Sequence, residues 1–344
     1  MGNFNIIAVD AMGGDQGPFV VVEAVVAFLT KYSDVRIILV GSSIACEFFS
    51  ASCSCPNIKE RVELMLCSVQ VDDSEKPTVS LRNKRDSSMA KVIELVALGD
   101  AHACVSAGNT GTMMSFGKRI LKTLPGITRP AICASMPTLN GSTLALDLGA
   151  NLECSAEQLH QFARLGSLTA KCLHKIDNPS IKLLNIGVEA MKGTPIIREA
   201  AKQISQDDTI NYCGFIEPNQ IFLGNVDVIV CDGISGNIAL KASEGVAEII
   251  TELYQKMFDR NWISRFGAFF FKRSASALKK NLNPSDHNGA FFLGLEGIVI
   301  KSHGSANTNS FGKALVTAKQ VLDQNIFQVL KSNVIAQFVT TTKS

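Results

Sequence analysis

The sequence predicts an α/β protein in which two layers of helices enclose a mainly parallel, mixed sheet, a three-layer α/β/α arrangement. Two observations support this prediction. Short apolar runs of strand length alternate along almost the whole chain with segments whose apolar residues recur at helical spacing. Most of these runs end in a polar, glycine-bearing loop, which is typical of parallel strands that turn into helices. Because ligands bind beyond the carboxyl ends of such strands, these loops are the expected site.

The first unit lies at the N-terminus. The apolar run 6–9 leads into a loop with paired glycines, and Pro18 then suits the first turn of a helix. Glycines let a ligand approach the backbone, and the N–H groups at a helix start attract anions. Paired glycines also occur in such turns for geometric reasons alone, so this loop by itself is weak evidence of a ligand site, and evidence from the rest of the chain is needed. Its candidate substrate-binding residues are Asp10, Gly13, Gly14 and Asp15.

The other elements follow in the same rhythm. Strands are predicted at 35–40, 64–71, 103–106, 132–135, 142–148, 181–186, 212–216, 226–231 and 298–300. Helices are predicted at 19–31, 88–98, 112–124 and 155–173, from Pro195, and from about residue 238. The runs 132–135 and 142–148 form either a hairpin or neighbouring strands. Residues 43–60 are hard to assign, and the charged segment 72–86 is predicted to be a loop.

Five polar loops after predicted strands define the candidate site. They are 10–15, 106–111, 147–151, 187–193 and 232–237. Together they indicate a ligand, because this much polarity at the strand ends exceeds what folding requires. Each residue alone has a structural alternative, such as an aspartate that braces its own loop. The further substrate-binding candidates are Gly108, Thr110, Gly111, Arg129, Asn151, Asp232, Gly236 and Lys241.

Four residues are candidates for catalytic roles. Lys192 lies at a strand end directly before a glycine, where it can hold an anion. His303 follows the apolar run 298–300 and precedes a glycine-serine turn, which suits a polarising group. Asn109 and Asn237 can donate hydrogen bonds to an oxyanion, although an asparagine after glycine often bonds only its own turn.

Composition and missing motifs exclude several classes of protein. A net charge of +2 is too mild to indicate nucleic acid. The sequence contains no G-x-S-x-G, H-E-x-x-H or G-x-G-x-x-G pattern. Five residues rather than four separate Gly111 from Gly117, so this segment does not match the phosphate-binding loop of an ATPase. No secretory signal precedes the ten cysteines, and their spacing does not match a metal site. Both observations favour a reducing cytoplasm. No apolar run reaches the ~18 residues of a membrane span. We therefore expect no metal and no cofactor.

Seven motifs, in order from residue 6 to about 305, resemble those of the phosphate acyltransferases of bacterial fatty acid and phospholipid synthesis. They are A-V-D-A-M-G-G-D, V-S-A-G-N-T-G, R-P-A-I, L-D-L-G-A-N, L-N-I-G-x-E-x-x-K-G, V-D-V-I-V-C-D-G-x-x-G-N-I-A-L-K and G-L-E-G-I-V-I-K-S-H-G-S. The resemblance implies a Rossmann-like fold related to those of phosphate acetyltransferase and isopropylmalate dehydrogenase. The chain departs from the family pattern at 16–17, at Val188 and at 287–289.

The resemblance also implies an activity. A long acyl group would move from acyl carrier protein to inorganic phosphate, and the acyl phosphate would feed a glycerol-phosphate acyltransferase. Because the thioester is already activated, neither nucleotide nor redox cofactor is required. The enzyme would act as a homodimer. Three alternatives stay open: a small-substrate phosphate acetyltransferase, a related decarboxylating dehydrogenase, and a non-enzymatic membrane-associated binder of carrier protein.

The chain 1–344 is predicted to be one domain with an amphipathic helical hairpin at about 247–282. In this segment Tyr254, Phe258, Trp262 and Phe266 recur every four residues, among mostly basic charges. Such a hairpin suits an anionic membrane surface or an acidic carrier protein, which places the protein in the cytoplasm at the inner face of the membrane. The predicted contact residues are Lys256, Arg260, Trp262, Arg265, Phe266, Phe270, Lys272 and Arg273.

Overall fold

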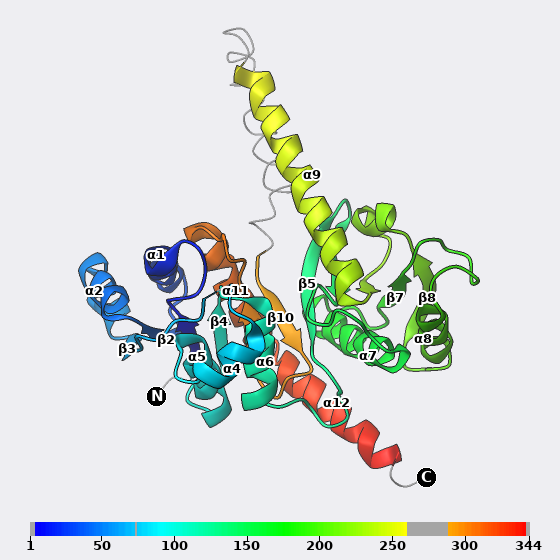
Figure 1. The fold of residues 1–344 in the computed structure, drawn as a ribbon, viewed down its shortest axis with the longest axis horizontal. Coiled ribbons are helices and arrows are strands. Elements are labelled where there is room, and N and C mark those ends of the chain that lie inside the picture. The colour runs from blue at the N-terminus through cyan, green and yellow to red at the C-terminus, as the bar shows by residue number, and fades with distance from the viewer. Residues whose placement is uncertain (1–3, 73, 260–287, 342–344) are drawn as a thin grey trace.

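The computed structural model describes residues 4–72, 74–259 and 288–341, and a single mixed sheet of eleven strands runs through this part of the chain (Figure 1). Seven of the ten strand pairings described are parallel. The strand order is β3-β2-β1-β4-β11-β10-β5-β6-β9-β7-β8. The predicted mainly parallel, mixed sheet is therefore confirmed.

Two parallel blocks make up most of the sheet. The first block contains β3 (Val62–Leu66), β2 (Val35–Gly41), β1 (Asn5–Asp10), β4 (Ala103–Ser106) and β11 (Ile298–Lys301). The second block contains β6 (Gly141–Leu146), β9 (Val228–Val230), β7 (Ser180–Leu184) and β8 (Asn211–Ile216). Between them β10 (Ala290–Leu293) and β5 (Ala131–Thr138) run antiparallel to their neighbours. Residues 139–140 connect β5 and β6, which form an antiparallel hairpin. This decides between the two arrangements, a hairpin or neighbouring strands, that the sequence allowed.

Helices pack on both faces of the sheet and form two apolar cores. One core joins the sheet to α1 (Gly17–Lys31), α2 (Ser43–Ser52), α7 (Ala156–Leu173), α8 (Pro195–Ser205), α11 (Thr308–Asp323) and α12 (Ile326–Thr341). The other joins the opposite face to α5 (Ser88–Leu98) and α6 (Thr110–Ile120). Side chains that alternate along the strands feed these two cores, as in Val9 and Ala8 of β1. This arrangement gives the predicted three layers.

Local sequence signals explain several helix starts. Pro18 lies in the first turn of α1, and Pro195 opens α8. Ser155 and Gln158 form a reciprocal capping box at the start of α7, as predicted. Ser87 caps α5, and its hydroxyl accepts a hydrogen bond from the Ala90 amide.

The prediction of a loop at 72–86 is wrong in its middle. Helix α4 (Pro77–Asn83) lies there, and Pro77 occupies its first turn, where proline is favoured. The charged composition of the segment had suggested a loop instead. The unassigned stretch 43–60 contains α2 and the short α3 (Pro56–Lys59). The strand predicted at 64–71 is also shifted, because β3 ends at Leu66 and an irregular segment follows. The short helix η1 (Pro218–Leu223) and strand β10 had no prediction.

Helix α9 (Gly233–Asp259) extends far out from the sheet (Figure 1). Lys256 lies on its outer part and pairs with Glu252 at 3.4 Å. The second arm of the predicted hairpin lies outside the described residues, as do the predicted contact residues Arg260, Trp262, Arg265, Phe266, Phe270, Lys272 and Arg273. Within the described ranges, none of the helices combines the length and apolar character needed to span a membrane.

Candidate functional site

The loops after β1 and β4 touch through their glycines. A β-carbon on Gly13 would lie 2.7 Å from the Gly108 nitrogen, so neither loop could keep its place with a larger residue there. Below this contact the buried Asp10 carboxylate accepts a hydrogen bond from the Ser106 hydroxyl at 2.7 Å, and that hydroxyl accepts one from the Gly108 amide at 3.1 Å. Burial raises the pKa of Asp10, while hydrogen bonds from the side chains of Ser106 and Ser88 and from the Met12 and Gly13 amides oppose the shift. The structure thus brings two of the five loops of the predicted site into direct contact.

The loop after β11 joins the same assembly. Gly14 has a φ of +93°, which favours glycine, and a β-carbon there would lie 2.9 Å from the Gly304 carbonyl oxygen. That carbonyl accepts a hydrogen bond from the Asp15 amide at 2.9 Å. Asp15 is exposed. Three loops of the first block therefore meet beyond the carboxyl ends of adjacent strands.

The loops after β6 and β9 form a second assembly. A β-carbon on Gly233 would lie 2.3 Å from the Asn151 carbonyl oxygen, and one on Gly236 would lie 2.0 Å from that of Asp147. These two glycines let the first turn of α9 rest on the 147–151 loop. Asn237, also in this turn, faces Gly149, whose β-carbon would contact the asparagine side chain at 3.5 Å.

Asp147 braces this second assembly. Its buried carboxylate accepts hydrogen bonds from the amides of Ile132, Ala150 and Asn151 and from the Asn151 side chain, at 2.7–3.1 Å. Burial raises its pKa against these hydrogen bonds. Asn151 also donates to the Pro130 carbonyl at 2.8 Å, which holds the exposed Arg129 near this loop. Asn151 is therefore a structural link, and its buried Oδ1 has no hydrogen-bond partner in the described residues.

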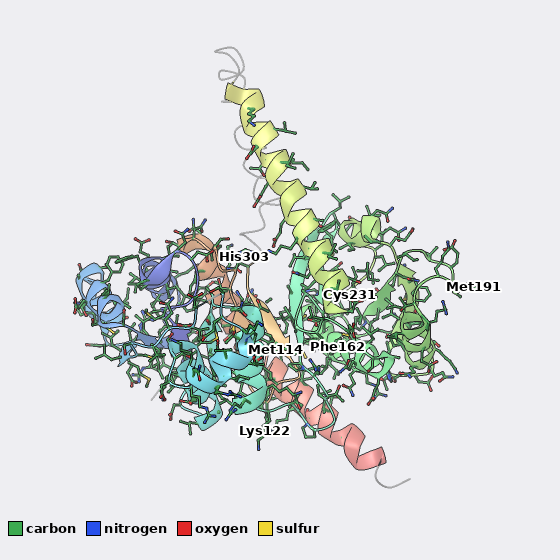
Figure 2. All side chains as sticks on the ribbon, in the orientation of Figure 1. Met114, Lys122, Phe162, Met191, Cys231 and His303 are labelled. Atoms are coloured by element: carbon green, nitrogen blue, oxygen red, sulfur yellow. The ribbon has the colours of Figure 1, made fainter. Side chains whose placement is uncertain are left out.

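A charged cluster joins the two assemblies. Lys241 on α9 places its Nζ 2.9 Å from the Nε2 of His303, which follows β11, and 2.7 Å from an Oε2 of Glu244. We call Lys241, Glu244 and His303 the Lys241 cluster. Figure 2 labels His303 on the side of the first block that faces α9. The cluster brings together two predicted site residues that are 62 positions apart in the chain.

Several groups act on the His303 imidazole. Partial burial and the nearby Lys241 ammonium lower its pKa, Glu244 opposes the shift, and Lys301 lowers the pKa further while Asp15 raises it. The net effect lowers the pKa of His303, so the ring is neutral at pH 7. Its Nδ1 lies 2.9 Å from the Ser305 hydroxyl, and its amide donates to the Asn288 side chain at 2.9 Å.

Two of the other predicted residues act as helix caps. The Asn109 side chain accepts a hydrogen bond from the Thr112 amide at the start of α6, where Thr110 and Gly111 are the first residues. Asp232 accepts from the Ser235 amide at 2.8 Å and from its hydroxyl at 2.9 Å, at the start of α9. These contacts support the structural alternative that the sequence left open for such residues.

Lys192 lies elsewhere. It is exposed on the loop between β7 and α8, and its carbonyl accepts a hydrogen bond from the Asn185 side chain at 3.2 Å. Its neighbour Met191 is labelled at the outer edge of the second block, across the molecule from His303 (Figure 2). In the described part of the chain no hydrogen bond or ion pair joins Lys192 to the Lys241 cluster, so its catalytic role stays a prediction.

Three residues around His303 had no prediction. Glu244, Ser305 and Asn288 contact Lys241 or His303, and Asn288 also donates to Ser302 and to the Ser310 carbonyl, both at 2.8 Å. Glu244 lies on the helical face of Lys241, three positions later, which is a usable signal. Ser305 belongs to the glycine-serine turn after His303, and Asn288 lies in a segment that departs from the family pattern, but neither position indicated a contact with His303.

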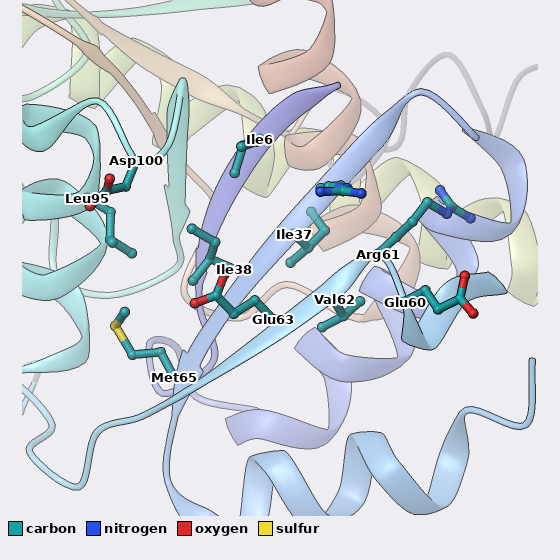
Figure 3. Close-up of a pocket in the computed structure, with 11 residues that line it drawn as sticks. Ile6, Ile37, Ile38, Glu60, Arg61, Val62, Glu63, Met65, Leu95 and Asp100 are labelled. Atoms are coloured by element: carbon teal, nitrogen blue, oxygen red, sulfur yellow. The ribbon is translucent and has the colours of Figure 1, made fainter. Parts of the chain in front are cut away.

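A separate pocket of about 490 Å³ lies over β1, β2 and β3 (Figure 3). Its buried cation, Arg61, donates to the carbonyls of Leu29 and Tyr32 at 2.7 Å and so completes the C-terminal end of α1. None of the predicted site residues lines this pocket. Its lining residues are Ile6, Arg36, Ile37, Ile38, Glu60, Arg61, Val62, Glu63, Met65, Leu95 and Asp100. Arg61 is therefore structural, and the candidate site is the junction of the loops.

Comparison with known proteins identifies the family. A family model described as "Fatty acid synthesis protein" matches residues 6–329. A phosphate acyltransferase from Coxiella burnetii (strain Dugway 5J108-111) is 44% identical over 329 residues, which cover 95% of this chain and 96% of that protein. One from Cellvibrio japonicus is 46% identical over 322 residues, which cover 94% and 96%.

A solved structure supports the fold. A phosphotransacetylase from Streptococcus pyogenes superposes with a TM-score of 0.60 at 20% identity, and the match covers 94% of this chain and 95% of that one. At this identity the match bears on the fold alone. The sequence relatives, in contrast, extend over nearly the full length of both partners at more than 40% identity. The chain therefore belongs to the phosphate acyltransferase family of fatty acid synthesis proteins.

Proposed function

We propose that this enzyme transfers a long acyl group from acyl carrier protein to inorganic phosphate, and that it releases acyl phosphate and free carrier protein. A phosphate oxygen attacks the thioester carbonyl carbon, the carbon–sulfur bond breaks, and the carrier thiol leaves. The observation that carries the proposal is the Lys241 cluster, which joins a cation to the glycine loops of both blocks.

The chemistry of these loops suits the reaction. The enzyme must hold a phosphate dianion beside a thioester carbonyl and stabilise the oxyanion that forms. Backbone N–H groups at the starts of α1, α6 and α9 and the Lys241 ammonium are suitable donors. Asn237 is exposed near the same junction and can donate to the oxyanion.

Exposed apolar side chains favour a long acyl group over a small one. Some follow β6 and β9, in or beside the second loop assembly, and the others follow β7, on the outer loop that carries Lys192: Leu152, Ile186, Val188, Met191, Ile234 and Ile238, each 45–88% exposed. Exposed apolar surface of this kind favours an apolar partner. A phosphate acetyltransferase would have no use for it, which supports the long-chain substrate.

One assay tests the proposal. The purified enzyme, palmitoyl carrier protein and inorganic phosphate should give acyl phosphate without nucleotide, metal or redox cofactor. Activity that is lost on chelation and restored by Mg²⁺ would contradict the metal-free reaction. A requirement for NAD(P) would favour the dehydrogenase alternative, and equal rates with acetyl and palmitoyl thioesters would favour the acetyltransferase.

We also propose a cellular arrangement. The enzyme is a homodimer at the inner face of the cell membrane, attached peripherally through the amphipathic hairpin at about 247–282. There it supplies acyl phosphate to a glycerol-phosphate acyltransferase. The aromatic and basic sequence of this segment supports the proposal. A row of exposed apolar residues on the described part of α9 adds to it: Val246, Ile249, Ile250 and Leu253.

A further inference from the structure

The hydrogen-bond geometry of the Lys241 cluster restricts the position of one proton. The Lys241 Nζ can only donate as an ammonium, and it lies 2.9 Å from the His303 Nε2. If Nε2 also carried a proton, two donors would face each other at hydrogen-bond distance. The Nε2 must therefore accept, and the proton of the neutral ring lies on Nδ1.

Ser305 places two groups at Nδ1. The hydroxyl, at 2.9 Å, can accept the Nδ1 proton, whereas the amide donates toward the same nitrogen at the longer distance of 3.3 Å. The shorter contact at each ring nitrogen, 2.9 Å in both cases, agrees with a proton on Nδ1. The His303 backbone is fixed separately by Asn288. Both ring nitrogens of His303 are then committed within the protein, and neither offers a proton to a substrate oxygen.

Lys241 differs in this respect. An ammonium has three N–H donors, and two of them are directed to Glu244 at 2.7 Å and to His303 at 2.9 Å. The side chains of Lys241 and His303 are about half exposed, at 51% and 48%. Among the residues that the structure describes, the third N–H has no partner, so it remains for a ligand that enters from solvent at the loop junction.

We propose that Lys241 contacts the phosphate substrate, and that Glu244 and His303 are positioning residues that fix its ammonium with two acceptors. This inference rests on the proposed function and assigns His303 a different role from the polarising one that its sequence position suggests. Glu244 holds the lysine from the same helix, while His303 holds it from the other block. The phosphate contact is thus complete only when α9 and the β11 loop are in place.

The charges around the ring supply a test of the contacts within the Lys241 cluster, and phosphate binding then tests the role of Lys241 as a substrate contact. Lys241 and Glu244 on α9, Lys301 on β11 and Asp15 on the first loop all act on His303. Removal of the lysine charge removes a repulsion, so Lys241→Met should raise the ring pKa. Removal of the carboxylate charge should lower it, so Glu244→Gln should shift the ring pKa the opposite way.

The experiment is an NMR titration of the histidine rings in the full-length enzyme, with the His303 signal assigned by a His303→Asn variant. We expect the ring pKa to fall in the order Lys241→Met, wild type, Glu244→Gln. Inorganic phosphate added at pH 7 should shift the His303 signal in the wild type and bind at least tenfold more weakly in Lys241→Met. Glu248→Gln, one turn farther along α9 and exposed, is the matched control and should behave as the wild type.

Two results would overturn the proposal: an identical ring pKa in the three proteins, or equal phosphate affinity in the wild type and Lys241→Met. Kinetics give a further readout, because Glu244→Gln should raise KM for phosphate more than KM for the thioester. If the titrations follow the expected order but the wild type forms no acyl phosphate, the proposed function fails and the assignment of Lys241 as an anion contact stands.

Discussion

A β-carbon placed on Gly13 would lie 2.7 Å from the backbone nitrogen of Gly108, so the loops after β1 and β4 are in direct contact at these two glycines. Gly13→Ala should force the loops apart and misplace their N–H groups. We expect kcat/KM to fall roughly 10²-fold, the scale of a 1 Å misplacement. Gly312→Ala on α11 is the control, because its β-carbon meets no described atom within 4 Å. Wild-type kinetics in Gly13→Ala would show that the loop contact is dispensable.

Two glycines of α9 should respond to alanine in opposite ways. The β-carbon of Gly236→Ala would lie 2.0 Å from the Asp147 carbonyl oxygen, and we expect the free energy of unfolding to fall by about 2 kcal/mol. A β-carbon on Gly245 would meet no described atom within 4 Å, so Gly245→Ala should raise the free energy of unfolding by up to about 1 kcal/mol through helix propensity. Urea unfolding of both variants measures the difference. Equal stabilities would contradict the close packing of α9 on the 147–151 loop.

The buried Asp207 should make stability depend on acid. Burial alone would raise its pKa, but hydrogen bonds from Arg164, Thr209 and His160 hold the pKa well below its ordinary value. A carboxylate with a depressed pKa stabilises the fold above the unfolded-state pKa, and this contribution is lost as the pH falls below about 4. Asp207→Asn should therefore cost about 2 kcal/mol at pH 7 and progressively less below pH 4.

The neighbouring Asp208 supplies the control for this measurement. It is exposed, so Asp208→Asn should leave the free energy of unfolding nearly unchanged across the same pH range. Thermal or urea unfolding from pH 3 to pH 7 compares the three proteins. A constant difference between Asp207→Asn and the wild type at every pH would argue against an ionised Asp207.

Lys192→Ala tests the cation that the sequence singles out. If Lys192 reaches the phosphate during turnover, kcat should fall by at least ~10²-fold while the fold is retained. Lys202→Ala, an exposed lysine on α8, should behave as the wild type. A near-normal rate for Lys192→Ala at saturating phosphate would make it a surface lysine, in keeping with its exposed place on the β7–α8 loop.

Sedimentation with lipid vesicles tests the amphipathic segment. The wild type should bind anionic vesicles more than neutral ones and less at high salt, since each basic residue near the lipid contributes roughly 1 kcal/mol. The triple variant Trp262→Ala, Phe266→Ala, Phe270→Ala should bind weakly. A triple variant of exposed apolar residues on the first block, Phe19→Ala, Ile44→Ala, Leu66→Ala, should bind as the wild type. Equal binding by both variants would exclude docking through the segment.

Much of the fold could be predicted, because periodicity is a local signal. The units around Asp10 and Ser106 follow directly from an apolar run, a glycine loop and a helical pattern. The start of α4 was missed because the acidic and basic residues around Pro77 suggest a loop. Strand β10 was missed because it is antiparallel to both of its neighbours and leads into β11 without a helix, so it lacks the strand–loop–helix pattern on which the other predictions depend.

The candidate site was predictable as a set of residues but not as a set of contacts. Sequence position identified Lys241 and His303 separately, yet their 2.9 Å contact depends on how β9 and β11 are placed in one sheet. Nothing in a local pattern encodes such a distance. Glu244 lacked a prediction for the same reason, since a carboxylate on a polar helix face becomes informative only when its partner is known.

The place of β11 in the sheet constrains how the chain can be made. Strand β4 pairs on one side with β1 and on the other with β11, and α1 packs against α11. The first block of the sheet therefore lacks strand β11 and helix α11 until the ribosome has released residues beyond 323. Contacts so distant in sequence form slowly, and the incomplete block presents an open sheet edge meanwhile. Nascent chains shorter than this should depend on chaperones, while the full-length chain closes its own edge.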